Sequence, residues 1–219
     1  MAQPIKILIA DDHELLRDGI KARLEKQSGW LICGEAGNGR DAVRLATALQ
    51  PDVVVMDIGM PQLNGIEAAT QIRQVSPKTG VLILTMQESE VLVRSALVAG
   101  VRGFLLKTDA GRLLITAVET VLAGKPFFTG RVSEIVLADF LNPDRAAQAA
   151  VDDRQRLTSR EREVLQLLAE AKTSKEAALT LGVSLKTVEA HRANIMRKLN
   201  VHSIAELVRY AVRNKIIEA

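Results

Sequence analysis

The sequence predicts an α/β domain followed by a small all-α domain. In the first part of the 219-residue chain, short aliphatic runs alternate with segments of helical periodicity, which is the pattern of a parallel sheet covered by helices. From residue 156 onward, only segments of helical periodicity remain. The length also suits two domains, since a domain takes roughly 100–200 residues.

The most informative strand is the run Val53–Met56, which is continuously apolar and ends at Asp57. Such a run, followed by a loop rich in Gly and Pro, is typical of a central strand buried on both faces. The expected strands cover residues 6–10, 31–36, 53–56, 81–85 and 103–106, and the expected helices cover residues 14–27, 40–49, 66–74, 88–99 and 110–122. Five strand–helix units with right-handed crossovers fit a doubly wound, flavodoxin-like (βα)5 order.

A connector is expected between the two domains. Residues 124–130 break the alternating pattern, and residues 131–141 have the spacing of one more helix. Residues 142–155 begin with Asn-Pro and lack apolar periodicity, so they are interpreted as the interdomain linker. We therefore expect the first domain at residues 1–125, the connector and linker at 126–155, and the second domain at 156–219.

Four helices are expected in the second domain, three of them marked by capping boxes. The spacing of Ser or Thr to Glu three residues later identifies the box, and it occurs at Thr158, Thr173 and Ser203. Ser184 precedes the remaining helix, which covers residues 185–199. The helices on either side of Gly182 are short and joined by a tight turn, so they predict a helix-turn-helix unit.

Composition and charge limit the partners. No apolar run approaches the roughly 20 residues of a membrane span, and the single cysteine, Cys33, excludes an internal disulfide and a cysteine metal cluster. We therefore expect a cytoplasmic protein without a membrane partner. From residue 156 onward the chain has twelve Lys and Arg residues against seven Asp and Glu residues, whereas residues 1–129 are neutral. This asymmetry favours a polyanion as the partner of the second domain, although a basic solvated surface is the alternative.

Polar residues stand at the ends of four predicted strands. Asp11 and Asp12 follow the first, Asp57 the third, Thr85 ends the fourth, and Lys107 follows the fifth. The carboxyl ends of parallel strands meet at one edge of a sheet, where ligands bind. Clustered carboxylates call for a hard divalent cation such as Mg²⁺, while a hydroxyl and an ammonium group are suitable donors to phosphoryl oxygens. The pattern predicts that Asp57 accepts a phosphoryl group.

The segments IADDHELLRDGI, VVVMDIGMPQLNG, VLILTM and GFLLK resemble the receiver domain of two-component response regulators. The resemblance covers about the first 125 residues. It implies that a sensor histidine kinase phosphorylates Asp57. It also implies that Asp12, Asp57 and the backbone carbonyl of Gly59 hold Mg²⁺ with help from Asp11, and that Thr85 and Lys107 bind the phosphoryl group.

Two further positions of the first domain have alternative interpretations. Phe104 stands where the family has an aromatic switch residue, often Tyr, so it is either a switch that acts through burial of its ring or a plain core residue. Residues 37–42 match a dinucleotide-binding pattern, but they follow the second strand rather than the first and are interpreted as a turn into a helix. No small-molecule cofactor is expected.

The expected helix 185–199 has a small, basic outer face. A projection at roughly 100° per residue puts Val188, Ile195 and Leu199 toward the core, with His191 near the buried edge. The opposite side and its neighbours are formed by Lys186, Glu189, Ala190, Ala193 and Arg197. Such a face suits insertion into the major groove of DNA, and a solvated amphipathic helix is the alternative.

The segment from Leu157 to Val201 resembles the LuxR-type helix-turn-helix, so the whole chain resembles a response regulator of the NarL/FixJ group. The resemblance implies DNA contacts from Ser174, Lys175, Ser184, Lys186, Thr187, Glu189, Ala190, Arg192, Ala193 and Arg197. Of these, Lys186, Thr187, Arg192 and Arg197 are expected at phosphates. Glu189 and Ala190 favour sparse readout of cytosine amino or thymine methyl groups. One departure is Ala171, where Gly is usual, and Ala is tolerated there only if the turn does not need a positive φ.

Together these patterns predict a phosphorylation-controlled transcription regulator that binds double-stranded promoter DNA. Without the phosphoryl group, the receiver is expected to mask the recognition helix or to hold a monomer, and phosphorylation is expected to expose that helix or to favour a homodimer. The protein is not expected to be an enzyme, beyond phosphorylation and autodephosphorylation at Asp57. The last helix, with Leu207, Val208, Val212 and Ile216, is a candidate dimer surface that could equally be domain core. Two alternatives are a constitutive DNA-binding dimer with a non-signalling receiver and a Mg²⁺-dependent phosphohydrolase. Phosphohydrolases with an Asp nucleophile characteristically place an Asp-x-Asp pair after the first strand, which this chain lacks.

Overall fold

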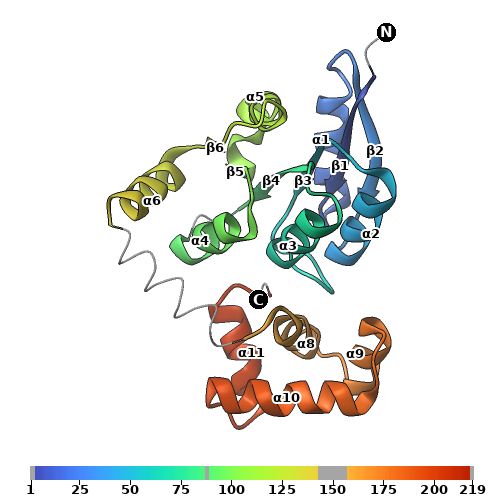
Figure 1. Cartoon of the computed structure of the whole chain (residues 1–219), viewed down its shortest axis with the longest axis vertical. Coiled ribbons are helices and arrows are strands. Elements are labelled where there is room, and N and C mark those ends of the chain that lie inside the picture. The colour runs from blue at the N-terminus through green and yellow to red at the C-terminus, as the bar shows by residue number, and fades with distance from the viewer. Residues whose placement is uncertain (1–2, 87–88, 143–156, 218–219) are drawn as a thin grey trace. The chain divides into compact units, whose positions relative to one another are not determined.

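The computed structural model describes residues 3–86, 89–142 and 157–217. The chain divides into two compact units, Met1–Leu141 and Asn142–Ala219. The first is built from a sheet and helices, and the second from helices (Figure 1).

Six parallel strands form one sheet in the order β2-β1-β3-β4-β5-β6. The five predicted strands are β1 (Ile5–Ala10), β2 (Trp30–Ala36), β3 (Val53–Met56), β4 (Gly80–Thr85) and β5 (Gly103–Leu106). Five strands were predicted, and the sixth, β6 (Phe127–Phe128), lies within residues 124–130 and pairs with β5 through Phe104 and Phe128. A strand of two residues has no periodicity, so the sequence does not reveal it.

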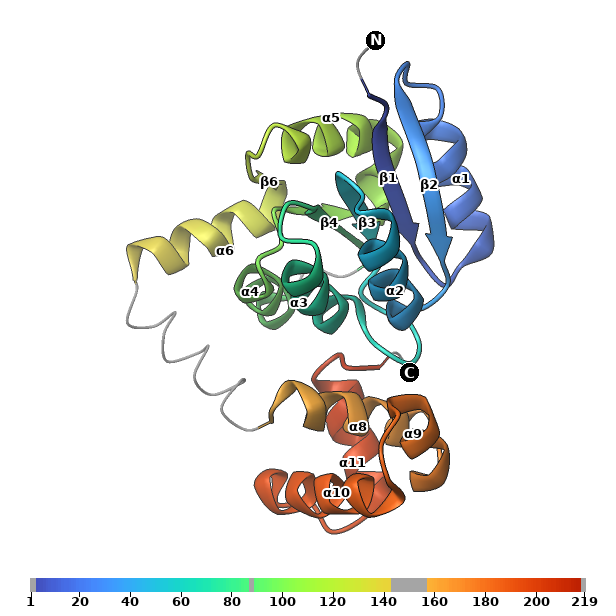
Figure 2. The same ribbon diagram turned by 45° about the vertical axis from the view of Figure 1, so that its right-hand side comes forward.

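Helices cover both faces of the sheet, as the doubly wound order requires. The predicted helices are α1 (Glu14–Leu24), α2 (Gly39–Leu49), α3 (Gly65–Val75), α4 (Glu90–Ala99) and α5 (Ala110–Leu122). Leu8 and Val54 point to the face covered by α2, α3 and α4, whereas Ile7 and Val55 point to the face covered by α1 and α5. Figure 2 shows α2, α3 and α4 side by side on their face. The sheet is thus buried between two helical layers.

The helix predicted over residues 131–141 is present as α6 (Gly130–Leu141), and it packs on the first unit. Val132 and Ile135 enter the core on the α4 side. The guanidinium of Arg94 on α4 donates to both carboxylate oxygens of Asp139, with Nε–Oδ2 at 3.0 Å and Nη2–Oδ1 at 2.9 Å. The compact unit therefore extends through Leu141, beyond residue 125. Of the linker predicted over residues 142–155, all but Asn142 lies outside the described residues.

The second unit contains the four predicted helices, α8 (Ser159–Ala169), α9 (Ser174–Leu181), α10 (Leu185–Leu199) and α11 (Ile204–Arg213). Complete capping boxes start α8 and α9, at Thr158 and Thr173. The box predicted at Ser203 is incomplete. Its hydroxyl accepts the backbone N–H of Glu206, but the Glu206 carboxylate accepts the N–H of His202 rather than that of Ser203. The second hydrogen bond of the box is therefore donated by His202, the residue before the N-cap, and not by the N-cap residue itself.

An ion pair joins two helices of this unit. The Nζ atom of Lys198, at the end of α10, lies 2.6 Å from Oε2 of Glu161, at the start of α8. Burial raises the pKa of Glu161, but hydrogen bonds from Lys198 and Thr158 outweigh that effect and hold the pKa below its ordinary value. Because the ionised form is favoured, the pair stabilises the unit at neutral pH, and this contribution is lost as the pH falls through the lowered pKa.

Ala171 adopts a positive φ of 60°, so the condition under which Ala would be tolerated at this turn is not met. The N–H of Ala171 donates to the carbonyl of Leu168, and the N–H of Lys172 donates to that of Leu167. This is the Schellman pattern that ends many helices, in which the left-handed residue is usually Gly because a Cβ atom is disfavoured there. The end of α8 therefore holds a strained residue.

Replacing Ala171 with Gly should stabilise the protein. Relief of the left-handed strain outweighs the greater chain entropy of Gly in the unfolded state, and we expect the free energy of unfolding to rise by about 0.5–1 kcal/mol. Urea unfolding of the full chain measures the change. The matched control is Gly182→Ala at the end of α9, where φ is 63°, and it should lower stability by a similar amount. A loss of stability in Ala171→Gly would contradict this account of the turn.

Candidate functional site

Two buried carboxylates and a lysine meet at the carboxyl edge of the sheet. Asp11 follows β1 and is 1% exposed, and Asp57 follows β3 and is 4% exposed. The Nζ atom of Lys107, which follows β5, lies 2.9 Å from Oδ2 of Asp11 and 2.8 Å from Oδ2 of Asp57. Lys107 is therefore in direct contact with both predicted carboxylates.

Asp12 and His13 complete the cluster on its exposed side. The Nδ1 atom of His13 lies 2.9 Å from Oδ1 of Asp12 and 3.3 Å from Oδ1 of Asp11. One ligand atom from each of Asp11, Asp12, His13 and Asp57 lies within 4.8 Å of the other three. His13 was not among the predicted site residues, although its position directly after the two aspartates was the available signal.

Backbone contacts hold Asp57 in place. Its N–H donates to the carbonyl of Ala10 at 2.8 Å, and its Oδ1 accepts the N–H of Ile58 at 2.8 Å. The first residue of α3, Gly65, packs against the carbonyl of Asp57, and an added Cβ would lie closer to that oxygen than real Cβ contacts allow. Asn64 caps α3 by accepting the N–H groups of Ile66 and Glu67. The loop after Asp57 thus requires Gly at position 65.

The charges of the site are strongly coupled. Burial raises the pKa of Asp57 above its ordinary value, and the nearby charge of Asp11 adds to this effect, while the contact with Lys107 opposes it. Burial alone lowers the pKa of Lys107, but its hydrogen bonds to Asp57 and Asp11 outweigh burial and raise the pKa. Lys107 is therefore a permanent cation beside the Asp57 carboxylate, which is costly to ionise.

The remaining predicted residues of the first unit lie at or near this edge. Thr85 is buried at the end of β4, and Gly59 lies half-buried in the bend after Asp57. Phe104 is 2% exposed and belongs to the core cluster that packs against α4. In this structure the ring of Phe104 is therefore a core side chain.

The donor set fits a hard divalent cation. Three of the four clustered groups are carboxylates, and oxygen ligands of this kind are those that Mg²⁺ prefers. Asp12 is partly exposed, which leaves one side of the cluster open to solvent. Among the described residues, this is the only group of His, Cys, Asp and Glu side chains close enough together to hold a metal ion.

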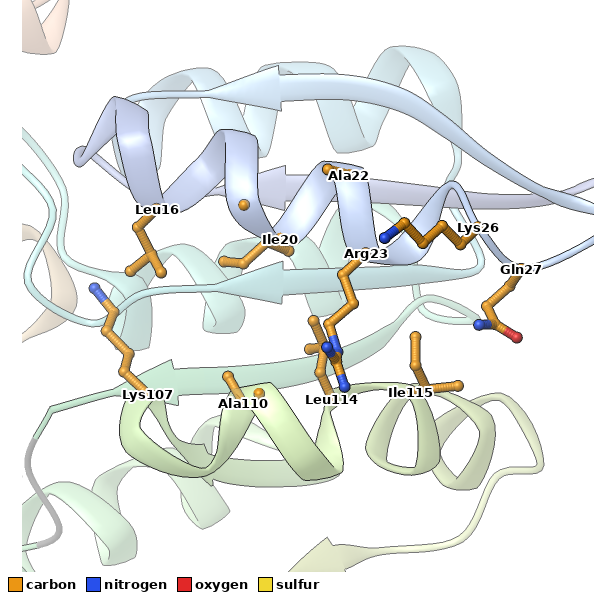
Figure 3. Close-up of a pocket in the computed structure, with 12 residues that line it drawn as sticks. Leu16, Ile20, Ala22, Arg23, Lys26, Gln27, Lys107, Ala110, Leu114 and Ile115 are labelled. Carbon is orange, nitrogen blue, oxygen red and sulfur yellow. The ribbon is translucent and has the colours of Figure 1, made fainter.

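A groove of about 570 Å³ runs between α1 and α5, beside this cluster. Figure 3 shows Lys107 at one end of the groove, with Arg23 of α1 and Lys26, which follows α1, farther along it. Its apolar lining comes from Leu16, Ile20, Ala110, Leu114 and Ile115. The groove therefore combines an apolar floor with a basic rim and ends at a residue that contacts Asp57.

The orientation predicted for helix α10 is confirmed by its burial. Val188 and Ile195 are fully buried, and His191 is half-buried. The predicted outer face is exposed at Lys186, Glu189, Ala190, Ala193 and Arg197, whereas Arg192 is half-buried. This face is accessible to a partner of the second unit.

The other residues for which DNA contacts were predicted lie at helix starts. Ser174 is the first residue of α9, and Lys175 beside it is exposed. The Oγ atom of Ser184 accepts the N–H of Thr187 at 3.1 Å and lies 2.8 Å from the Thr187 hydroxyl, so both hydroxyls take part in the cap of α10. In the part of the chain that the structure describes, neither Lys175 nor Lys186 forms an ion pair with an acidic side chain.

The candidate dimer helix α11 is partly core. Leu207 is fully buried, and Ile216 packs against the core of the unit. Val208 and Val212 are half-buried, and Ile204 is exposed.

No helix among the described residues is long and apolar enough to cross a membrane.

Comparison with known proteins gives two family matches. Residues 7–119 match the response regulator receiver domain, and residues 155–211 match the bacterial regulatory proteins of the luxR family. The oxygen regulatory protein NreC of Staphylococcus carnosus is 37% identical over 216 residues, which cover 98% of this chain and 100% of the relative. The transcriptional regulatory protein MctR of Rhizobium johnstonii is 33% identical over 97% of this chain and 95% of its own length.

A solved structure shows the same architecture. RcsB from Salmonella enterica serovar Typhimurium, bound to the promoter rprA in the presence of the phosphomimetic BeF3⁻, aligns with a TM-score of 0.62 and 26% identity. The alignment covers 95% of this chain and 98% of RcsB. Both halves of the chain, their order and their fold are thus shared with known regulators, and the chain belongs to the two-component response regulators of the NarL/FixJ group, DNA-binding transcription regulators that join a receiver domain to a LuxR-type helix-turn-helix domain.

Proposed function

We propose that Asp57 accepts a phosphoryl group from a sensor histidine kinase and that this event controls promoter binding by the second domain. The observation that carries the proposal is the buried contact of Asp57 and Asp11 with Lys107. Membership of a family of DNA-binding regulators sets aside the phosphohydrolase alternative. The constitutive dimer remains as the rival, and it differs in predicting that Asp57 has no influence on DNA binding.

In the proposed transfer, an oxygen of Asp57 forms a bond to phosphorus while the bond between phosphorus and the imidazole nitrogen of the kinase breaks. Two contacts orient the Asp57 carboxylate. Its Oδ1 accepts the N–H of Ile58, and its Oδ2 contacts the ammonium of Lys107. Lys107 then pairs with an oxygen of the transferred group, and the Thr85 hydroxyl donates to another. Mg²⁺, when bound by Asp11, Asp12, Asp57 and the Gly59 carbonyl, supplies positive charge that offsets the repulsion between the carboxylates and the phosphoryl oxygens.

The groove between α1 and α5 is the proposed docking surface for the kinase. Its apolar floor suits the apolar stripe of a partner helix, and its end at Lys107 brings such a helix close to Asp57. Arg23 and Lys26 on the rim favour acidic side chains on that helix. A partner seated in the groove would therefore be both aligned with the acceptor and selected by charge.

Reversing the rim charges should separate kinase recognition from chemistry. In Arg23→Glu/Lys26→Glu, we expect phosphotransfer from a kinase that labels the unmodified chain to slow by roughly tenfold or more, because electrostatic steering is lost. Labelling by acetyl phosphate, which needs no docking surface, should stay within about twofold. Lys78→Glu, an exposed lysine just before β4, is the control. Equal slowing with both donors would contradict this assignment of the groove.

The outer face of α10 is proposed to enter the major groove of promoter DNA. Lys186 and Arg197 are assigned to phosphates, which carry no sequence information, while Glu189 and Ala190 are assigned to base edges. Phosphorylation is proposed to favour a homodimer that binds two half-sites. Val208, Val212 and Ile204 of α11 are the exposed or half-buried apolar residues available for such a contact.

Removing one phosphate contact should weaken DNA binding without changing its specificity. For Lys186→Ala, we expect similar losses of affinity on promoter and random DNA, and a slope of log K against log salt that is smaller by about 1. Titrations at several salt concentrations measure both quantities. Arg213→Ala, an exposed cation at the end of α11, should leave the slope unchanged. A change in sequence preference without a change in slope would reassign Lys186 to base readout.

A further inference from the structure

The imidazole of His13 faces the acidic cluster but has no part in the function proposed above. Its Nδ1 atom lies 2.9 Å from Oδ1 of Asp12 and 3.3 Å from Oδ1 of Asp11, and 61% of the side chain is exposed. The ring thus stands at the open side of the cluster, where a cation and its water ligands would enter. A nitrogen donor at this position changes which metals the site can hold.

The spacing of the four side chains suits one six-coordinate ion. With bonds of roughly 2.1 Å, adjacent ligands of an octahedral ion lie roughly 3.0 Å apart and opposite ligands roughly 4.2 Å apart. The ligand atoms of Asp11, Asp12, His13 and Asp57 all lie within 4.8 Å of one another. Small side-chain adjustments would therefore bring the imidazole nitrogen and the carboxylates onto the same ion.

We propose that His13 is a nitrogen ligand of this site, so that the receiver domain binds late first-row divalent metals such as Ni²⁺ and Zn²⁺ as well as Mg²⁺. Imidazole suits Ni²⁺ and Zn²⁺, whereas Mg²⁺ is held by oxygen ligands and water. His13 therefore sets the metal selectivity of the site more than its affinity for Mg²⁺. This inference rests on the proposed cation site of Asp11, Asp12 and Asp57.

His13 can be replaced with little risk to the fold. It is the N-cap residue of α1, but its side chain forms no capping hydrogen bond. Its contribution to the loop is made by the backbone, whose N–H donates to Oδ1 of Asp11 at 2.8 Å. Asn is among the preferred N-cap residues, so His13→Asn keeps or improves the start of the helix.

A different role for the ring makes a different prediction. If the imidazole only donates a hydrogen bond to Asp12, it competes with every cation for that carboxylate. Its removal would then raise the affinity for Ni²⁺ and Mg²⁺ by similar factors. If the imidazole is instead a metal ligand, its removal lowers the affinity for Ni²⁺ alone.

Calorimetric titration of the untagged full chain with Ni²⁺ and, separately, with Mg²⁺ tests the proposal. In His13→Asn we expect the Kd for Ni²⁺ to rise by about tenfold or more, as for other losses of metal-site groups, with the Kd for Mg²⁺ within about twofold. His202→Asn, which removes an exposed imidazole from the second unit, should change neither value. Equal shifts for both metals, or an unchanged Kd for Ni²⁺, would overturn the ligand role. Failure of the unmodified chain to bind Mg²⁺ would instead overturn the proposed cation site, and the inference with it.

Discussion

Replacing Asp57 with Asn abolishes labelling by acetyl phosphate and at the same time stabilises the protein. The amide has no anionic oxygen to attack phosphorus, and no second carboxylate follows β3 to replace it. The gain in stability follows from the raised pKa of Asp57, because a buried group that resists ionisation destabilises the folded state when the pH forces it to ionise. We expect the free energy of unfolding at neutral pH to rise by about 1 kcal/mol, a size common for substitutions that relieve a functional site.

The pH dependence identifies the cause of the gain. The folded-state pKa of Asp57 is raised, so its unfavourable effect is absent at low pH and grows as the pH rises through the range in which the unfolded chain ionises. The stability difference between Asp57→Asn and the unmodified chain should therefore widen from about pH 4 to neutral pH. Asp18→Asn, at an exposed position on α1, is the matched control for labelling and stability. Retained labelling in Asp57→Asn would remove this residue from the proposed mechanism.

Replacing Lys107 with Met should have the opposite effect on stability. The substitution keeps a side chain of similar length but leaves the buried carboxylates of Asp11 and Asp57 without their shared cation. Breaking a buried ion pair from one side costs about 3 kcal/mol or more, because the partner charge stays buried. We expect a loss of this size in the free energy of unfolding at neutral pH, measured by urea unfolding.

Two further measurements identify the carboxylates as the source of that loss. The destabilisation should shrink as the pH falls, since protonation of Asp57, whose pKa is raised by burial, removes part of the uncompensated charge. Adding Asp57→Asn to Lys107→Met should restore part of the stability, because one of the two buried charges is then absent. Lys78→Met, at an exposed lysine, should stay within about 0.5 kcal/mol of the unmodified chain. A loss in Lys107→Met that is independent of pH and of Asp57→Asn would mean that packing, not charge, is responsible.

The sequence was sufficient for features that depend on periodicity and on strand ends. The contact of Asp11, Asp57 and Lys107 followed from the rule that parallel strands end at one edge, without any knowledge of distances. The burial of Val188 and Ile195 on α10 followed from the helical repeat. The first feature follows from the order of strands and helices, and the second from the spacing of residues within one helix.

Features that depend on contacts between distant segments were not predictable. Two contacts join segments whose sequences carry no periodic pattern that predicts the contact. These are the pairing of β6 with β5 and the Arg94–Asp139 ion pair, which attaches α6 to α4. The positive φ of Ala171 contradicts the preference of Ala, so the residue type alone leaves the conformation of this turn open. The close approach of Gly65 to Asp57 likewise becomes visible only once β3 and α3 are placed. His13 was missed because one imidazole beside two carboxylates has no distinctive spacing.

The coupling of Asp57 to DNA binding is tested most directly by promoter titrations of the unmodified chain and of Asp57→Asn, each with and without beryllofluoride, with oligomeric state followed by size-exclusion chromatography. For the unmodified chain, we predict that beryllofluoride favours the dimer and tightens promoter binding by about tenfold or more, within the usual range of coupling between two sites. Asp57→Asn should bind DNA without responding to beryllofluoride. Identical promoter affinity with and without beryllofluoride in the unmodified chain, or an equal response in Asp57→Asn, would contradict control of DNA binding through Asp57.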